Sequence, residues 1–559
     1  MAKRNSIFRK VVQNLEKDGL DHHEAVKMAQ KAVRSTNGKH FQPDGHGSNL
    51  VRPITIVDDV CTQAPLTCDS NSNFRTIDGK CNNLQNPYWG AMSVAFSREI
   101  AVDTYDPKSK SILLDEDDEM ITKMNRKKGK GSKGGNSGKK SCPKRGTLPS
   151  ARFVSHTFHT SENISSTDAT HMLTQWGQFL DHDLTLTPEN EEHGCCEDNT
   201  ADECFPILVP SNDSFYQSHS VNCLEFARSV AHCEENGGTR QQTNAITSFV
   251  DASNVYGSDN DTAVSLRSLV DGKLLIEDNE LLPQVDGEEV AGDTRALEMP
   301  GLATMHTLFV REHNRLCDLI KAARPGWNDE EIYQNARRIL IAEYQSITYG
   351  GFLPVVLGSK NMNNLKLSKK GSKYKPEVNP TMTNEFATAS FRFGHSMIQG
   401  LIKLFHTDNS GQFDEYFLHE NFFNMYTYRE SMENILMGLI TQPAQEFDKE
   451  ITSETTNLLF PEEGHSFGSD LAARNIQRGR DHGLPGFCCY YKLYDDKKHN
   501  CKKGWGKKYR NISSKNWALL KTIYDHPKDI DLFTGLLAQK SHNGALGGKV
   551  IMKMKSKFF

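Results

Sequence analysis

Apolar residues recur at helical spacing along most of this chain. In LFVREHNRLCDLIKAA, residues 308–323, they stand three or four positions apart, which places them on one face of an α-helix. A basic version of this pattern at residues 7–34 predicts another amphipathic helix, either a docking helix, which we favour, or a membrane-surface helix. Residues 165–355 and 382–535 are mostly helical in pattern, with few alternating, strand-like runs. The sequence therefore predicts a mainly α fold with little β structure, built as one large domain.

The composition is that of a soluble globular protein. Of the 559 residues, 37% are apolar and 25% are charged, and a chain of this length can bury a large core. No apolar run reaches the roughly 18 residues that a membrane-spanning helix needs, so we expect no membrane span. The formal net charge of −5 gives no electrostatic case for nucleic-acid binding. We interpret the Lys/Gly-rich stretch at 123–145 as a solvated loop, in preference to a nucleic-acid or heparin site.

The cysteines and glycosylation sequons indicate an oxidising compartment. Thirteen cysteines are present, most of them clustered in the first half of the chain, and N-glycosylation sequons stand at Asn163, Asn212, Asn260 and Asn511. Together they favour a secreted, disulfide-bonded glycoprotein. The first residues contain no apolar signal-peptide core, so we expect the sequence to begin inside a longer secreted chain. A cytosolic protein with free thiols is the alternative.

The segment QFLDHD, residues 178–183, places one histidine between two aspartates. On a helix, Gln178, Asp181 and His182 share a face, whereas Asp183 points about 100° away from His182. The apolar flanks indicate partial burial, where polar groups need partners. Taken alone, the segment also fits a solvated polar patch. If it is functional, the two aspartates serve two different sites.

Four further segments follow in order: TSFVDAS (247–253), GDTRALEMP (292–300), FRFGHSMI (391–398) and RNIQRGRDHGLPGF (474–487). They match no zinc, P-loop or serine-triad spacing. With QFLDHD they resemble the animal haem peroxidases, and RTIDGKCNN (75–83) and LPSARFVS (148–155) are similar to that family's amino-terminal motifs. The resemblance runs from about residue 68 to 533. It implies haem buried among central helices and hydrogen peroxide as a substrate.

The resemblance assigns the distal side of the haem. His182 matches the base that moves a proton between the two peroxide oxygens, and Arg295 matches the guanidinium that stabilises the developing charge. Gln178 is similar to the residue that binds a distal water or halide. Asp181 and Glu298 match the carboxylates that form esters with the haem. One covalently linked, haem b-derived cofactor per chain is therefore expected.

Met299 follows the second ester carboxylate. In some members of the family a methionine here joins a haem vinyl group as a sulfonium. Packing ahead of Pro300 is an equally good interpretation.

The proximal side is assigned in the same way. His395 matches the histidine that binds the haem iron, and Arg392, one helical turn earlier, matches the partner of a haem propionate. Asn475 matches the acceptor of the imidazole hydrogen bond, which favours higher oxidation states of the iron. Without the resemblance His395 would be an ordinary core histidine. Three other histidines belong to helices that pack or cap and are not assigned to the iron: His306, His313 and His482.

A calcium site is also implied. The family's calcium loop is matched by Thr247, Phe249 through its carbonyl, Asp251 and Ser253, together with Asp183 from the first segment. These are hard oxygen ligands of the kind that Ca²⁺ prefers. Alone, TSFVDAS would describe only a turn or a helix cap.

The resemblance also favours particular disulfides. Four clustered cysteines allow three connectivities, among which the residues alone do not choose. By resemblance we expect Cys195–Cys204 and Cys196–Cys223, besides a local Cys68–Cys81 bridge. No partner is assigned to Cys488, Cys489 and Cys501.

Three regions are expected: a helical, propeptide-like extension at 1–60, the peroxidase domain at 61–540 with an insertion at 123–145, and an atypical tail at 541–559. The tail matches nothing that we expect of the family after DIDLFTGLLAQ. We therefore expect apolar surface on that side to be uncovered and the domain to be less stable.

The leading hypothesis is a haem-dependent peroxidase that uses hydrogen peroxide to oxidise halides or phenols such as protein tyrosines. The alternative is a secreted adhesion or matrix protein that uses an inactive peroxidase scaffold. The complete set of distal and proximal residues favours the enzyme, and the altered tail favours the scaffold. Neither the physiological substrate nor the oligomeric state follows from the sequence.

Overall fold

The computed structural model describes residue 61 and residues 64–555, apart from 101–141, 144, 191–193, 234–239, 286–287, 366, 368–373, 409 and 463. The predicted extension and helix within residues 1–60, and most of the Lys/Gly-rich insertion, lie outside the described residues. The structural statements below concern the described part of the chain.

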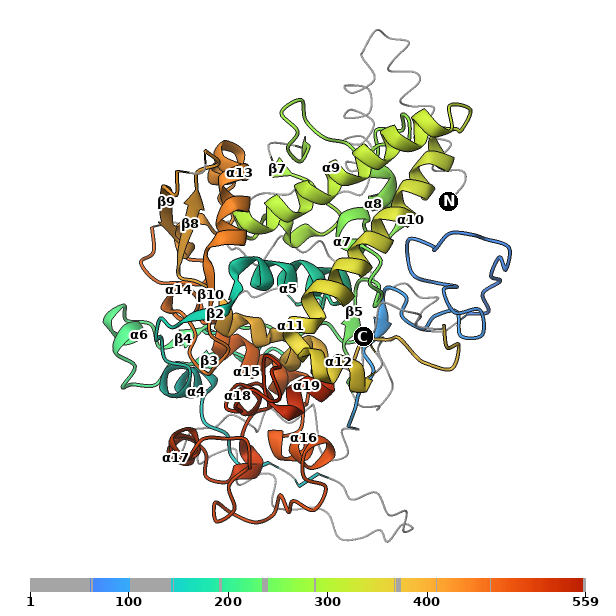
Figure 1. Ribbon diagram of the computed structural model, residues 1–559. Helices are drawn as coiled ribbons and strands as arrows, with labels where there is room; N and C mark the ends of the chain where they lie inside the picture. The colour runs from blue at the N-terminus through green and yellow to red at the C-terminus, as the bar shows by residue number, and fades with distance from the viewer. Residues whose placement is uncertain are drawn as a thin grey trace.

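The fold is mainly α-helical, as predicted. Helix α5 (His171–Leu184) lies near the middle of the molecule, with the paired helices α9 (Pro300–Ala323) and α10 (Asp329–Ile347) on one side of it (Figure 1). Helix α13 (Tyr426–Thr441) packs against both α5 and α9. Trp176 and Phe179 of α5 stack with Phe309 of α9 and Tyr344 of α10 in one buried aromatic cluster. The core is therefore built around α5.

Local signals explain the two longest helices. Helix α9 has Pro300 in its first turn, where a missing N–H is harmless, and it contains the helix predicted at 308–323. Helix α10 begins with a capping box in which Asn328 and Glu331 bond each other's backbone N–H groups. Both helices bury one face and expose the other. The helical pattern in this part of the sequence is confirmed.

The remaining helices are short. They are α4 (Ala151–Phe158), α6 (Ser214–Ser218), α7 (Ser253–Tyr256), α8 (Asn260–Ser265), α11 (Leu353–Leu357), α12 (Ser359–Leu365), α14 (Ser453–Thr456), α15 (Leu471–Asp481), α16 (Phe487–Tyr494), α17 (Ser514–Ile523), α18 (Leu532–Leu537) and α19 (Lys549–Lys555). Tighter or wider turns form η1 (Thr294–Leu297), η2 (Thr348–Phe352), η3 (Phe386–Ser390), η4 (Phe391–Met397), η5 (Leu418–Asn421) and η6 (Pro527–Asp529).

Strands occur only as antiparallel pairs within the described residues. The pairs are β1 (Val94–Ala95) with β5 (Thr243–Asn244), β2 (Ser165–Thr170) with β10 (Pro443–Gln445), β3 (Ile207–Leu208) with β4 (Cys223–Leu224), β6 (Gln284–Val285) with β7 (Glu288–Glu289), and β8 (Leu401–Phe405) with β9 (Phe413–Phe417). In the longest pair, Leu401 faces Phe417 and Phe405 faces Phe413. Two-stranded sheets this small cannot form the core, so the expectation of little β structure is confirmed.

The expectation of mostly helical structure at 165–355 is wrong between α5 and α9. In the described part of residues 185–299 the longest helix is α8, with six residues. Aspartates here bond nearby backbone N–H groups, as Asp213 and Asp259 do at the starts of α6 and α8. Such side-chain bonds compete with continued helix, which explains the irregular structure.

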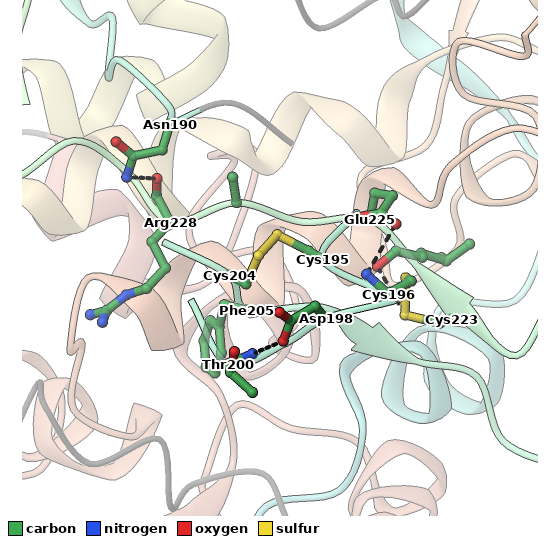
Figure 2. The surroundings of a disulfide bond; sticks show 12 residues. Asn190, Cys195, Cys196, Asp198, Thr200, Cys204, Phe205, Cys223, Glu225 and Arg228 are labelled. Atoms are coloured by element: carbon green, nitrogen blue, oxygen red, sulfur yellow. Dashed lines mark hydrogen bonds between the residues drawn. A yellow bond between two sulfur atoms is a disulfide. The ribbon is translucent and has the colours of Figure 1, made fainter. Parts of the chain in front are cut away.

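Disulfides hold this irregular region together. Figure 2 shows the adjacent residues Cys195 and Cys196 bonded to Cys204 and Cys223, as predicted. The Cys68–Cys81 bridge is also confirmed. Three further disulfides were not predicted: Cys61–Cys233, Cys142–Cys489 and Cys488–Cys501. Cys317 is a buried free thiol.

The tail is part of the packed structure. Helix α19 lies against α16 and η3, and it buries Val550, Ile551 and Met554 completely. Leu546, just before it, donates its N–H to the carbonyl of Val356 at 2.9 Å. The apolar surface that we expected to be bare on this side is therefore covered by the tail. The domain boundaries at 61 and 540 stay predictions.

Candidate functional site

Helix α5 presents its polar residues in two directions, as their spacing predicts. On one face, Gln178 Nε2 donates to Glu298 Oε2 at 3.2 Å, and Asp181 Oδ1 accepts from Thr185 Oγ1 at 3.0 Å. On the other, Asp183 accepts hydrogen bonds from the segment that begins α7. The two aspartates beside His182 thus serve different sites.

Arg295 is fixed next to His182 by an ion pair with Asp293. The Arg295 Nε and Nη2 atoms donate to the two carboxylate oxygens of Asp293 at 2.9 and 2.8 Å, and Nη2 lies 3.4 Å from the His182 carbonyl. Burial alone would raise the pKa of Asp293, but Arg295 lowers it to about 2. Asp293 is buried, with 4% of its surface exposed, and Arg295 is half-buried, so the pair is not a surface contact.

His182 is a buried, neutral imidazole. Burial, and then the nearby Arg295 cation, holds the pKa of His182 well below its usual value. Its Nδ1 atom lies 3.8 Å from Asp293 Oδ1 and has no protein hydrogen-bond partner. A neutral imidazole beside a fixed guanidinium can accept a proton while the guanidinium stabilises negative charge.

Asp181 and Glu298 are half-buried carboxyl groups with few hydrogen bonds. Burial raises the pKa of Asp181, and it raises the pKa of Glu298 to about 7. A charged carboxylate is costly in such a place unless it is paired. Ester formation would remove that charge, so these two residues fit covalent attachment of a haem.

His395 is held by Asn475. The Asn475 Nδ2 atom is 2.7 Å from His395 Nδ1, and Asn475 Oδ1 accepts from Arg392 Nη1 at 2.8 Å. The segment is the 3₁₀ helix η4, whose three residues per turn place Arg392 and His395 on the same side. Burial, and then Arg392, lowers the pKa of His395 to about 3, so the ring is neutral. In this amide orientation Asn475 donates to Nδ1, the reverse of the acceptor role that the resemblance implies, and the ring proton is on Nε2. Turning the amide over would let Asn475 accept from Nδ1–H and free Nε2 for a metal.

Arg392 belongs to a cluster of three arginines, of which Arg478 is buried and the other two are half-buried. Burial, and then Arg478 and Arg474, lowers the pKa of Arg392 to about 10, although Asp181 and Glu189 oppose the shift. Arg474 and Arg478 both pair with Glu189, at 3.2 and 2.5 Å. Surplus positive charge of this kind fits a haem propionate. Helices α5 and η4 pack against each other, and the Asp181 carboxylate of α5 acts on Arg392 of η4.

The predicted calcium ligands are brought together around α7. Asp183 Oδ1 accepts from the N–H and the hydroxyl of Ser253 at 2.6 and 2.7 Å, and Thr247 Oγ1 donates to Asp251 Oδ1 at 2.9 Å. Asp251 Oδ2 is buried without a protein hydrogen-bond partner. Burial, and then repulsion from Asp251, raises the pKa of Asp183 well above its usual value.

Two buried carboxylates and two hydroxyls form a donor set that fits Ca²⁺, which would neutralise the repulsion. Phe249 lies in the same loop, with its ring beneath the guanidinium of Arg75 at 5.3 Å.

The loop that contains Asp293 packs closely against helix α7. A Cβ atom on Gly292 would lie 2.5 Å from the carbonyl carbon of Val255 and 2.6 Å from the carbonyl oxygen of Asn254, so only glycine fits. The close packing of α7 against the Asp293 loop thus leaves no room for a side chain at position 292. The residue before Asp293 thus touches α7, whose first residue is the candidate calcium ligand Ser253.

An aromatic cluster that the sequence did not predict lies beside Glu298. The N–H of Phe423 donates to the Glu298 carbonyl at 3.2 Å, and the rings of Phe422 and Phe423 lie 4.9 and 4.8 Å from that of Phe460. Phe423 and Phe460 have positive φ angles of 56° and 52°, which are strained for a residue with a side chain. Strain of this kind is typical of functional sites, and no sequence signal marks it.

Met299 caps the start of α9 without a side-chain hydrogen bond, and its side chain packs against the core. This position agrees with both interpretations of the residue.

Comparison of this sequence with known proteins identifies the family to which the chain belongs. The model of the family described as animal haem peroxidase matches residues 74–559. Peroxidasin of Drosophila melanogaster is 32% identical over 528 residues, which are 85% of this chain and 32% of that protein. Myeloperoxidase of Mus musculus is 34% identical over 529 residues, covering 86% of this chain and 69% of that protein. The chain belongs to the animal haem peroxidase family.

The fold is shared with solved structures. Peroxidase A from Dictyostelium discoideum superimposes with a TM-score of 0.68 at 24% identity, covering 87% of this chain and 90% of that one. The chain spans about a third of the length of the fly peroxidasin that it matches. Within the described residues, we find no helix with the length and apolarity needed to cross a membrane.

Proposed function

We propose that this chain is a haem-dependent peroxidase that reduces hydrogen peroxide and oxidises a small donor. The observation that carries the proposal is the presence of two neutral histidines with fixed partners on two elements, α5 and η4, that pack against each other. His182 lies beside the Arg295–Asp293 ion pair, and His395 is bonded to Asn475. An inactive scaffold would require neither the contact of His182 with the Arg295–Asp293 ion pair nor the hydrogen bond between His395 and Asn475.

Each of the proposed site residues has a role in the reaction with hydrogen peroxide. Haem, when bound through His395 Nε2, would supply electrons to peroxide and recover them from the donor. His182 accepts a proton from one peroxide oxygen and returns it to the other, which leaves as water. Arg295 stabilises the negative charge that develops on the leaving oxygen. Gln178, whose amide lies between Gln175 and Glu298, orients the incoming peroxide or halide.

The haem would be held on both sides. Asp181 and Glu298 are the proposed ester-forming carboxylates, and Arg392 is the proposed propionate partner. Asn475 holds the His395 ring in place, and with its amide turned over it would accept from the ring N–H, which supports higher oxidation states of the iron. Calcium would bind Asp183, Thr247, Asp251, Ser253 and the carbonyl of Phe249, and so would tie α5 to α7.

The donor is a halide or a phenol. The aromatic cluster of Phe422, Phe423 and Phe460 beside Glu298 favours a phenol, because aromatic rings stack on one another. Six disulfides favour an extracellular site of action.

The test is an absorption spectrum and a turnover assay on the purified chain loaded with haem. We expect one haem per chain, a Soret band, and peroxide-dependent oxidation of a simple phenol and of bromide. His395→Ala should remove or strongly shift the Soret band, whereas His171→Ala, a control on a buried histidine of α5, should leave it unchanged. Haem binding without turnover would favour the scaffold, and an unchanged His395→Ala spectrum would refute the proximal assignment.

A further inference from the structure

Tyr256 of α7 is a buried phenol whose hydroxyl group is hydrogen-bonded to a buried histidine. Its side chain is 1% exposed, and the hydroxyl oxygen lies 2.8 Å from Nδ1 of His313 in α9. His313 is 0% exposed, and its Nε2 atom lies 2.9 Å from the carbonyl oxygen of Gly272. Neither side chain has a part in the reaction with peroxide described above.

The contact with Gly272 fixes the direction of the bond between Tyr256 and His313. A carbonyl oxygen only accepts, so Nε2 of His313 carries the ring proton, and Nδ1 holds the lone pair that accepts from the Tyr256 hydroxyl. The sulfur of Cys317 lies farther from Nε2, at 3.4 Å, and a thiol is a weak donor, so the carbonyl decides the tautomer. Burial lowers the pKa of His313 to about 4, which keeps the ring neutral. The phenolic proton therefore already points at a base.

A phenol held against a base in this way can give up an electron and a proton together. Burial raises the pKa of Tyr256 well above its usual value, so the phenolate does not form first. A positive charge on the ring is also disfavoured, because the Arg337 guanidinium lies 5.7 Å from the ring centroid. A phenol that loses an electron becomes a strong acid, so its proton moves along the existing hydrogen bond to His313. A neutral phenoxyl group remains on Tyr256.

Helix α7 joins this pair to the proposed haem site. It packs against both α5 and α9, and Asn254 Nδ2 donates to the carbonyl of Phe179 in α5 at 2.8 Å. His182 lies one turn further along α5. Tyr256 thus belongs to an element in direct contact with the helix that carries the proposed distal base. Electrons, unlike atoms, pass between buried groups that do not touch.

We propose that Tyr256 is an internal one-electron donor of the peroxidase, with His313 as its proton acceptor. Reduction of hydrogen peroxide to two waters takes two electrons and two protons, and the protons come from solvent. One electron leaves the Tyr256 ring while its proton moves to His313 Nδ1, and the other electron comes from the haem or from an external donor. An external donor later returns an electron to Tyr256, and His313 returns the proton. The inference rests on the proposed reaction with peroxide.

The test is electron paramagnetic resonance of the haem-loaded full chain, frozen after addition of equimolar hydrogen peroxide without a donor. The variants are Tyr256→Phe, His313→Gln and, as the matched control, Tyr344→Phe. Tyr344 is 0% exposed and touches α5 directly, but its hydroxyl is bonded to the Phe179 carbonyl at 3.3 Å and to the Asn254 amide. Neither of these groups takes up a proton, so the control separates closeness to α5 from the presence of a base.

We expect a phenoxyl radical signal in the wild type and in Tyr344→Phe, and none in Tyr256→Phe. His313→Gln should lose the signal too, because an amide accepts a hydrogen bond but not the proton. Electron–nuclear double resonance of the wild type should show one exchangeable proton, on His313 Nδ1, that disappears in deuterated buffer. A purely structural bond between Tyr256 and His313 would produce neither the signal nor this coupling.

The outcomes separate this inference from the proposed function. A chain that neither binds haem nor consumes peroxide would overturn both. Peroxide-dependent oxidation of an external phenol, with no radical in the wild type or an unchanged radical in Tyr256→Phe, would overturn only the role of Tyr256. Loss of the signal in Tyr344→Phe would also overturn it. If Tyr256→Phe does not fold, an unchanged signal in His313→Gln would decide against the proposal.

Discussion

Ser253 donates both its backbone N–H and its hydroxyl to one oxygen of Asp183, at 2.6 and 2.7 Å, across 70 residues of chain. This double contact joins the C-terminal end of α5 to the start of α7. It places a carboxylate in a fully buried position next to Asp251. The arrangement has a measurable consequence for metal binding.

Removing calcium should destabilise the protein. A ligand present at about 100 times its Kd stabilises the folded state by roughly 2.7 kcal/mol, so chelation with EGTA should lower the melting temperature. Asp183→Ala should abolish the difference between calcium-loaded and chelated samples, whereas Asp168→Ala, at an exposed position, should preserve it. Identical melting curves with and without EGTA for the wild type would contradict the calcium assignment.

Replacing His182 should affect the reaction with peroxide more than the binding of haem. Loss of a general acid–base group reduces rates by about 10² or more, so His182→Ala should react with peroxide at least that much more slowly. The haem content and the Soret band should stay near those of the wild type, because His395 is intact. Stopped-flow absorbance checks the rate, with His171→Ala as the control on the same helix.

Met299→Gln distinguishes the two interpretations of the methionine. A sulfonium would withdraw electrons from the haem, so its loss should shift the Soret band to the blue and remove chloride oxidation while iodide oxidation remains. Spectra and halide assays of the two proteins provide the measurement. An unchanged spectrum would identify Met299 as a packing residue and leave the proposed esters of Asp181 and Glu298 untouched.

Lys555 should make stability depend on pH at the alkaline end. It is 0% exposed, its Nζ atom lies over the ring of Phe393 without a hydrogen-bond partner, and burial lowers its pKa well below the usual value. The folded state therefore binds fewer protons than the unfolded state between the two pKa values. Stability rises with pH across this window and is lost as the pH falls from about 10.4 towards the folded pKa.

Lys555→Met should accordingly raise the free energy of unfolding at pH 7 by about 1–3 kcal/mol, since an unsatisfied polar group is removed. Urea melts between pH 7 and 10 should show a weaker pH dependence in this variant. Lys540→Met, at an exposed position, should behave as the wild type. A destabilised Lys555→Met protein would show that Lys555 has a partner.

The elements that the sequence predicts well are those whose signals are local. Helix α9 carries a regular apolar stripe, and α5 places Gln178, Asp181 and His182 on one face through their spacing alone. The motif resemblance then named the remaining site residues. Their convergence depends on the fold, because residues as far apart as His395 and Asn475 meet only after the helices pack.

Other features have no local signal. Cys142 pairs with Cys489 across 347 residues, so neither residue's neighbours identify the bond. The burial of Asp293 is not visible in GDTRALEMP, because exposure is a property of the packed structure. His313 was grouped with packing histidines, since its bond to a buried tyrosine hydroxyl is visible only in three dimensions. The positive φ angle of Phe423 runs against the preference of its residue type.

The contact of Gly292 with Asn254 and Val255 would couple the proposed calcium site to the proposed distal site. If peroxide or a halide shifts the loop of Asp293, it also shifts the α7 segment, and it therefore changes the affinity for calcium. By reciprocity the metal changes the affinity of the distal pocket by the same factor. Gly292 is then the point through which metal occupancy sets anion affinity, so a calcium titration followed at the haem would measure the coupling free energy.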